Sequence, residues 1–164
     1  MRIGYDAKRA FNNHRGLGNY SRETLRVLAS HFPDLQLDLF TPKIDPNIRF
    51  ACPENATIIQ PKHEFMTSLW RTFGITRAAE KQHLDLYHGL SHELPVGIER
   101  TRIPTVVTMH DLIFVRHPEL YPFFDRTSYK AKYLHSCRVA DRIIAVSEQT
   151  KKDLIELWGI EESK

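Results

Sequence analysis

Residues 1–28 have the sequence MRIGYDAKRAFNNHRGLGNYSRETLRVL, and this stretch decides the fold class. Its first segment, Arg2–Tyr5, is short and carries apolar side chains at Ile3 and Tyr5, which predicts a first β-strand. A polar loop over residues 6–15 leads to Gly16 and Gly18. Asn19 stands at a helix N-cap position, and Leu25, Leu28 and Phe32 then recur at helical spacing until Pro33 ends the predicted helix.

The rest of the chain continues this alternation of strands and helices. We expect further strands at 35–40, 57–59, 84–87, 104–109 and 142–146, with loops at 42–56 and 88–102. Helical spacing appears at Phe65, Leu69 and Phe73, with a break at Gly74, and again from Thr127 to Cys137; Ser147 and Gly159 cap a last helix. The pattern predicts a doubly wound α/β domain, with a mostly parallel, Rossmann-like sheet.

Composition narrows the functional class. The chain has 164 residues, a net charge of +3 and two cysteines, Cys52 and Cys137. The charge is too small, and too evenly spread, to indicate a nucleic-acid partner. Neither a signal peptide nor an apolar run of about 20 residues is visible, so we expect a cytoplasmic protein in a reducing compartment.

Four features follow predicted strands, where ligands bind in open parallel sheets. They are the Arg15–Tyr20 turn, the His88-Gly89 pair, the His110-Asp111 pair and the Ser147-Glu148 pair. We therefore expect a site at this edge of the sheet.

The glycine turn indicates phosphate binding. Glycines before a helix let backbone N–H groups approach a phosphate, and the helix N-terminus adds partial positive charge. Ser21 occupies the third position of a dinucleotide fingerprint, the turn lies far from the first strand, and no acidic residue ends the second strand. These departures exclude a nicotinamide cofactor and leave a plain loop-to-helix turn as the alternative.

Histidines supply the candidate chemistry. His110 follows the most apolar strand, where its imidazole can hydrogen-bond a substrate oxygen while Asp111 orients it. The alternative is a histidine that only packs at the edge of the sheet. His88 and His92 have a metal-like spacing, but their loop contains Gly89 and Pro95, so we expect no metal site.

The helix around residues 65–73 is aromatic on one side and basic on the other. Lys62, Arg71, Arg77 and Lys81 surround Leu69, Trp70 and Phe73. The pattern favours a helix that faces the core with a solvated basic face, and peripheral membrane contact is the alternative.

Taken in order, these motifs resemble the N-terminal domain of a retaining glycosyltransferase of family 4, with the GT-B fold. The similarity covers nearly the whole chain. It includes the turn RGLGNYSRETLRVL, the D-x-x-H segment Asp85–His88, the strand end Thr108-Met109-His110-Asp111, and AVSEQTKKDL at Ala145–Leu154.

The resemblance implies roles for the matching positions. His110 and Asp111 would be catalytic, and Gly16, Gly18 and Asn19 would approach the donor diphosphate. Arg15, His88, Ser147 and Glu148 would line the cleft edge or the acceptor site. The expected partners are a nucleotide sugar and a glycan or lipid-linked acceptor, and no metal or other cofactor is expected.

The resemblance also implies a missing half. In this family the nucleotide sugar binds to a second domain, which carries an E-x7-E motif together with Arg and Lys for the phosphates, and we expect no such domain within residues 1–164. We expect this chain to be inactive alone, and the full protein to transfer a hexose such as mannose in surface polysaccharide biosynthesis. A stand-alone phospholigand-binding module and a nucleotide-sugar epimerase or phosphate-processing hydrolase of similar fold are the alternatives.

Overall fold

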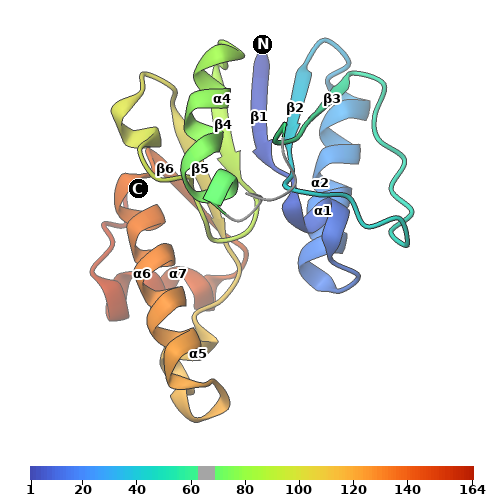
Figure 1. Cartoon of the computed structure of the whole chain (residues 1–164). Helices are drawn as coiled ribbons and strands as arrows, with labels where there is room; N and C mark the ends of the chain where they lie inside the picture. The colour runs from blue at the N-terminus through green and yellow to red at the C-terminus, as the bar shows by residue number, and fades with distance from the viewer. Residues whose placement is uncertain (63–68) are drawn as a thin grey trace.

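The computed structural model describes residues 1–62 and 69–164, which form one parallel sheet flanked by helices (Figure 1). The sheet has six strands in the order β3-β2-β1-β4-β5-β6. Every pair of neighbouring strands is parallel. The strands are β1 (Arg2–Asp6), β2 (Gln36–Phe40), β3 (Ala56–Ile59), β4 (Leu86–Gly89), β5 (Thr105–Met109) and β6 (Arg142–Ala145).

Helices connect the strands on both faces of the sheet. They are α1 (Lys8–Asn12), α2 (Gly16–His31), α4 (Ile75–Lys81), α5 (Ile113–Arg116), α6 (Phe123–Val139) and α7 (Glu148–Trp158). A π-helical segment, η2 (Trp70–Gly74), runs directly into α4, and short 3₁₀ turns cover η3 (Ile98–Arg100) and η4 (Pro118–Leu120).

Two apolar clusters, one on each face, hold these layers together. On one face, Leu25 of α2 and Phe11 of α1 pack against Leu37 and Leu39 of the sheet. On the other face, the cluster joins buried residues of α4, α6 and α7 to the other side of the strands. The predicted doubly wound, Rossmann-like sheet is therefore confirmed, and all of its pairs are parallel.

The strand order places a crevice at the middle of the sheet. β1 pairs with β2 on one side and with β4 on the other, so the chain connections diverge from β1 in opposite directions. Ligands in open parallel sheets bind where this reversal occurs, outside the carboxyl ends of the strands.

Four local predictions were wrong, and three of them concern helices. Helix α2 begins at Gly16 with Arg15 at its N-cap, so Asn19 lies inside the first turn, and residues 6–15 include the short helix α1. Gly74 does not break its helix, which changes from π to α pitch there; a Cβ at this position would crowd the Trp70 indole ring.

Strand β4 lies two residues further along than predicted, which brings His88 and Gly89 into the sheet. The predicted helical position Phe65 lies outside the described residues.

Candidate active site

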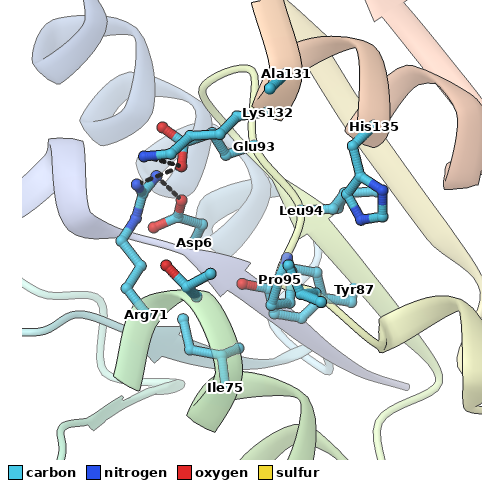
Figure 2. A pocket seen from close by; sticks show the side chains of 12 residues that line it. Asp6, Arg71, Ile75, Tyr87, Glu93, Leu94, Pro95, Ala131, Lys132 and His135 are labelled. Carbon is cyan, nitrogen blue, oxygen red and sulfur yellow. Dashed lines mark hydrogen bonds and ion pairs between the residues drawn. The ribbon is translucent and has the colours of Figure 1, made fainter. Parts of the chain in front are cut away.

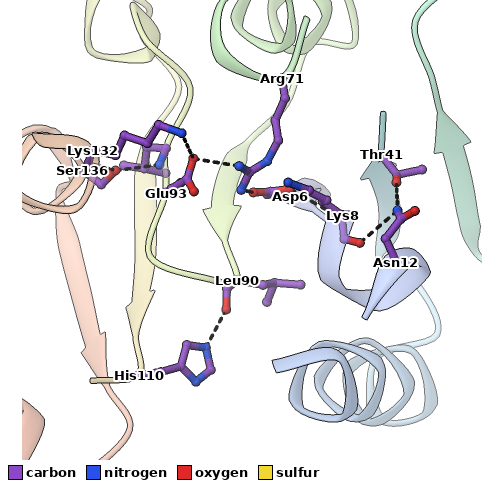
Figure 3. A network of polar contacts seen from close by, with 11 residues as sticks. Asp6, Lys8, Asn12, Thr41, Arg71, Leu90, Glu93, His110, Lys132 and Ser136 are labelled. Atoms are coloured by element: carbon purple, nitrogen blue, oxygen red, sulfur yellow. Dashed lines mark hydrogen bonds and ion pairs between the residues drawn. The ribbon is translucent and has the colours of Figure 1, made fainter. Parts of the chain in front are cut away.

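His110 lies directly after β5, and three hydrogen bonds from two elements hold it in place. Its ring Nε2 donates to the carbonyl oxygen of Leu90 at 2.9 Å, as Figure 3 shows. Its backbone N–H donates to Nε2 of His92 at 3.2 Å, and its carbonyl oxygen accepts from the Thr150 hydroxyl at 2.8 Å. The position of this imidazole is therefore set by the loop after β4 and by α7.

The glycine turn and His110 come together through Tyr20. The Tyr20 and His110 rings meet edge to face, with centroids 4.7 Å apart. The Tyr20 hydroxyl lies 3.3 Å from that of Thr108 on β5. Since Tyr20 stands in the first turns of α2, this contact places the N-terminal end of α2 beside the imidazole.

The two glycines of the turn have different reasons to be glycine. A Cβ on Gly18 would overlap the carbonyl oxygen of Asn13, and the Gly18 N–H already donates to the Asn13 side chain at 3.3 Å. Gly16 is exposed, and nothing lies near the position of its Cβ. The open approach to the helix N-terminus is therefore at Gly16, while Gly18 permits close packing.

The neighbours of these glycines already have partners. Asn19 donates its backbone N–H to the Arg15 carbonyl at 3.0 Å, and its side-chain oxygen accepts from Arg22 at 2.7 Å. The Arg15 backbone N–H donates to Asn13 at 2.8 Å, and the residue itself is exposed. Asn19 is thus occupied by helix contacts, whereas the Arg15 side chain extends into solvent at the helix N-terminus.

The resemblance implied that His88 lines the cleft edge or the acceptor site. In the structure, however, this residue is buried. Because β4 extends to Gly89, His88 is only 8% exposed, and its Nε2 lies 2.8 Å from the Thr108 hydroxyl. Burial lowers the pKa of His88 to about 4. His88 therefore contacts the Thr108 hydroxyl, which in turn contacts the Tyr20 hydroxyl.

His92 contacts His110 directly, a role that its spacing to His88 did not predict. It is 4% exposed, has a left-handed backbone φ of 64°, and stacks on Tyr133 with centroids 4.4 Å apart. Burial, with added repulsion from His110 and Arg9, lowers its pKa to about 3. A neutral His92 is what the contact requires, because its Nε2 must accept the His110 N–H.

Asp111 does not orient His110. Its carboxylate accepts the backbone N–H of Ile113 at 3.3 Å and so helps to begin α5. The carbonyl of Leu90 orients the imidazole instead. No sequence pattern indicates such a contact, because a backbone oxygen carries no residue-specific signal.

Ser147 caps α7, as predicted, and Glu148 is the first residue of that helix. The Ser147 hydroxyl accepts from the Thr150 backbone at 3.1 Å, and the same Thr150 bonds the His110 carbonyl. Both Ser147 and Glu148 line a separate cavity of about 260 Å³ beside β6. Ser147 therefore reaches His110 only through Thr150.

A buried ion network lies next to this site and was not predicted. Arg71 donates to Asp6 at 2.6 Å and to Glu93 at 2.7 Å, with side-chain exposures of 11%, 4% and 21% respectively (Figure 3). Burial alone would lower the pKa of Arg71, but the two carboxylates outweigh it and raise that pKa. The network joins the end of β1, the helix before α4 and the loop after β4.

We expected the aromatic side of helix 69–81 to face the core. Two of its side chains are instead exposed. Leu69 is 54% exposed and Phe73 is 60% exposed. With Trp70 they line a groove of about 680 Å³, whose rim includes Lys62, Arg77 and Lys81.

Within the described residues, no group of three or more His, Cys, Asp or Glu side chains could hold a metal ion. No helix of residues 1–62 or 69–164 is long and apolar enough to cross a membrane.

Comparison with known proteins identifies the family of this chain. No curated protein matches the chain. The family model of Glycosyltransferase Family 4 matches residues 14–164, which include the glycine turn, His110 and the segment that begins α7. Because the match covers most of the chain, and the fold is the Rossmann-like domain that the family implies, this chain belongs to Glycosyltransferase Family 4.

Proposed function

We propose that this chain is the acceptor-side domain of a retaining glycosyltransferase that moves a hexose from a nucleotide sugar to a glycan or lipid-linked acceptor. The observation that carries the proposal is the contact between Tyr20 and His110, which sets an open helix N-terminus at Gly16 beside a fixed imidazole. The family match favours this reading over an epimerase or a hydrolase.

The chemistry follows from what each group can do. In the proposed transfer, the bond between the anomeric carbon and the diphosphate oxygen breaks, a bond from that carbon to an acceptor oxygen forms, and the acceptor hydroxyl passes its proton to the leaving diphosphate. The leaving diphosphate gains negative charge, which the N–H groups and dipole of α2 can stabilise near Gly16. Arg15, exposed at the same helix end, adds a positive side chain.

His110 has the role of orienting the transferring sugar in this proposal. Its ring is fixed by the Leu90 carbonyl and contacts Tyr20, so it cannot rotate freely. A fixed hydrogen-bonding group costs no reorganisation when the sugar reaches its transition state. Asp111 lies next to His110, but its carboxylate faces the start of α5, so its part is to shape the loop.

The groove along helix 69–81 supports a membrane-associated acceptor. Leu69 and Phe73 expose apolar surface, and Lys62, Arg77 and Lys81 set positive charge around it. Such a combination suits the interface of an anionic bilayer. We propose that the enzyme works at the cytoplasmic face of a membrane, with mannose as the first donor sugar to test and surface polysaccharide as the product class.

The test is a donor screen on the full-length protein and on residues 1–164 alone. Each protein is mixed with a panel of nucleotide sugars, GDP-mannose and UDP-glucose included, and release of the free nucleoside diphosphate is measured. Turnover by the full-length protein with one donor, and none by the isolated chain, is the expected result. Robust turnover by residues 1–164 alone would contradict the proposal that the second domain is needed.

A further inference from the structure

A cavity of about 210 Å³ lies at the carboxyl edge of the sheet, on the face that α4 and α6 cover (Figure 2). Its walls come from four parts of the chain: the end of β1, the helix at residues 71–75, the loop after β4 and the middle of α6. Ile75, Leu94 and Pro95 form its apolar side. Tyr87 stands at the base, and Lys132 and His135 approach from α6, as Figure 2 shows.

Three polar atoms of this lining are buried and have no hydrogen-bond partner among the described residues. They are the Tyr87 hydroxyl, the Nε of Arg71 and the Nε2 of His135. Buried polar groups in native proteins are nearly always paired, so three orphans around one cavity need an explanation. Tyr87 is the clearest case: the residue is fully buried, and phenylalanine would fill the same space without an unpaired hydroxyl.

The charges around the cavity balance. Arg71 pairs with Asp6 and Glu93, and Lys132 lies 3.9 Å from Glu93. Two cations thus face two carboxylates. A charged ligand of either sign would be repelled by the two side chains that carry the same sign of charge. A neutral ligand with several hydroxyl groups, by contrast, finds both hydrogen-bond donors and acceptors.

We infer that this cavity binds one neutral sugar ring of the acceptor. This inference rests on the proposed glycosyltransferase function and adds to it the class of ligand. Ring hydroxyls accept from Arg71 and His135 and pair with the Tyr87 hydroxyl, while the C–H face of the ring packs on Leu94 and Pro95. The cavity has the volume of about seven water molecules, which suits a single pyranose ring.

Binding requires a small adjustment of the lining. The orphaned atoms have almost no water-accessible surface, so the ring reaches them by displacing neighbouring side chains. Lys132, with 49% of its side chain exposed, and Val96, which is 39% exposed, line the cavity and have room to move outward.

The test compares Tyr87→Phe with Tyr129→Phe in the chain of residues 1–164. Methyl α-D-mannopyranoside and methyl β-D-glucopyranoside are the probes, binding is followed by ligand-observed NMR, and stability is followed by urea unfolding. Y87F should unfold at the same or a higher urea concentration and should weaken binding of the preferred glycoside roughly tenfold. Y129F removes a tyrosine hydroxyl outside the cavity, so it should bind as the wild type does.

Three results would overturn the inference. They are unchanged binding by Y87F, a loss of stability in Y87F (which would show that the hydroxyl already has a partner) and no binding of either glycoside by the wild type. A third probe is methyl β-D-glucuronide, which carries a carboxylate. It should bind more weakly than the glucoside, and tighter binding would contradict a neutral ligand.

These outcomes are separable from those of the donor screen. Glycoside binding is measured without any nucleotide sugar, so it can succeed where no transfer is found. Equally, transfer by the full-length protein together with an empty cavity would reject this inference and leave the proposed function standing.

Discussion

The Nε2 atom of His110 lies 2.9 Å from the carbonyl oxygen of Leu90. A carbonyl can only accept a hydrogen bond, so Nε2 carries a proton, and in the neutral ring the lone pair is on Nδ1. No residue of the described chain bonds Nδ1. In this neutral tautomer, the atom that His110 offers to a substrate is an acceptor, which suits a sugar hydroxyl better than a phosphate oxygen.

Replacing His110 should reduce transfer far more than it reduces stability. We expect His110→Ala in the full-length protein to lower kcat about 100-fold, because a hydrogen bond that positions the reacting sugar is lost. His110→Asn, which also offers an acceptor oxygen, should recover part of that rate. The measurement is release of nucleoside diphosphate, with urea unfolding as the control. Unchanged transfer in H110A would remove His110 from the catalytic site.

The variants Gly16→Ala and Gly18→Ala test two different roles of the turn: approach of the donor diphosphate at Gly16 and close packing at Gly18. A Cβ on Gly18 would overlap the Asn13 carbonyl, so G18A should lower the urea midpoint. Gly16 has open space around its Cβ position and should tolerate alanine in the folded state. We expect G16A to raise the KM for the nucleotide sugar several-fold at unchanged stability. If G16A leaves KM unchanged, the donor diphosphate does not approach this turn.

The layers of this domain could be predicted from its sequence, whereas most contacts of the site could not. Apolar runs such as PTVVTM and the caps Ser147 and Gly159 are local signals, and they locate β5 and α7 to within one residue. Tyr20, His92 and Arg71 act through partners far away in the chain. The type of a residue does not indicate which distant residue it contacts, because those contacts depend on the order of the strands in the sheet.

Small shifts in strand boundaries decide the chemistry of a site. Strand β4 differs from the prediction by two residues, which turns His88 from a loop residue into a buried support. Periodicity defines strand ends poorly, so a candidate residue at a strand end needs the structure to show whether it is accessible.

The buried histidines predict a stability that falls in mild acid. Burial lowers the pKa of His88 to about 4 and that of His92 to about 3, from 6.5. Below pH 6.5 the unfolded chain therefore binds protons that the folded chain does not. The free energy of unfolding should fall by up to about 1.4 kcal/mol per pH unit for each histidine, down to about pH 4.

Urea unfolding between pH 7 and pH 4 measures this dependence. His88→Asn should make the slope shallower, since it removes one of the two groups. His31→Gln, on the exposed end of α2, keeps both buried histidines and should keep the slope. A stability that is constant across this range would mean that the two rings can be protonated in the folded protein.

Removing the cap of α7 should cost stability. The Ser147 hydroxyl accepts from the Thr150 backbone N–H at 3.1 Å, so Ser147→Ala leaves that donor unpaired. We expect a loss of about 1 kcal/mol in the free energy of unfolding, measured with urea. Ser128→Ala, at an exposed position within α6, is the matched control and should not destabilise the fold. Equal effects of the two variants would show that the cap contributes nothing.

Breaking the buried network around Arg71 should have the largest effect on folding. Arg71→Met keeps a side chain of similar length but leaves Asp6 and Glu93 without their shared cation. An uncompensated buried charge costs about 3–5 kcal/mol, and urea unfolding should show a loss of that size. Arg26→Ala, in the exposed pair with Glu23, is the control and should leave the urea midpoint nearly unchanged.

The decisive comparison is the triple variant Asp6→Asn, Arg71→Met, Glu93→Gln. It removes all three charges together, so no unpaired charge is left in the interior, and most of the stability lost in R71M should return. Recovery of stability would show that R71M is destabilised by the carboxylates of Asp6 and Glu93, which have lost their cation. A triple variant as unstable as R71M would show instead that the packing of the Arg71 side chain, which joins β1 to the loop after β4, holds this edge of the sheet together.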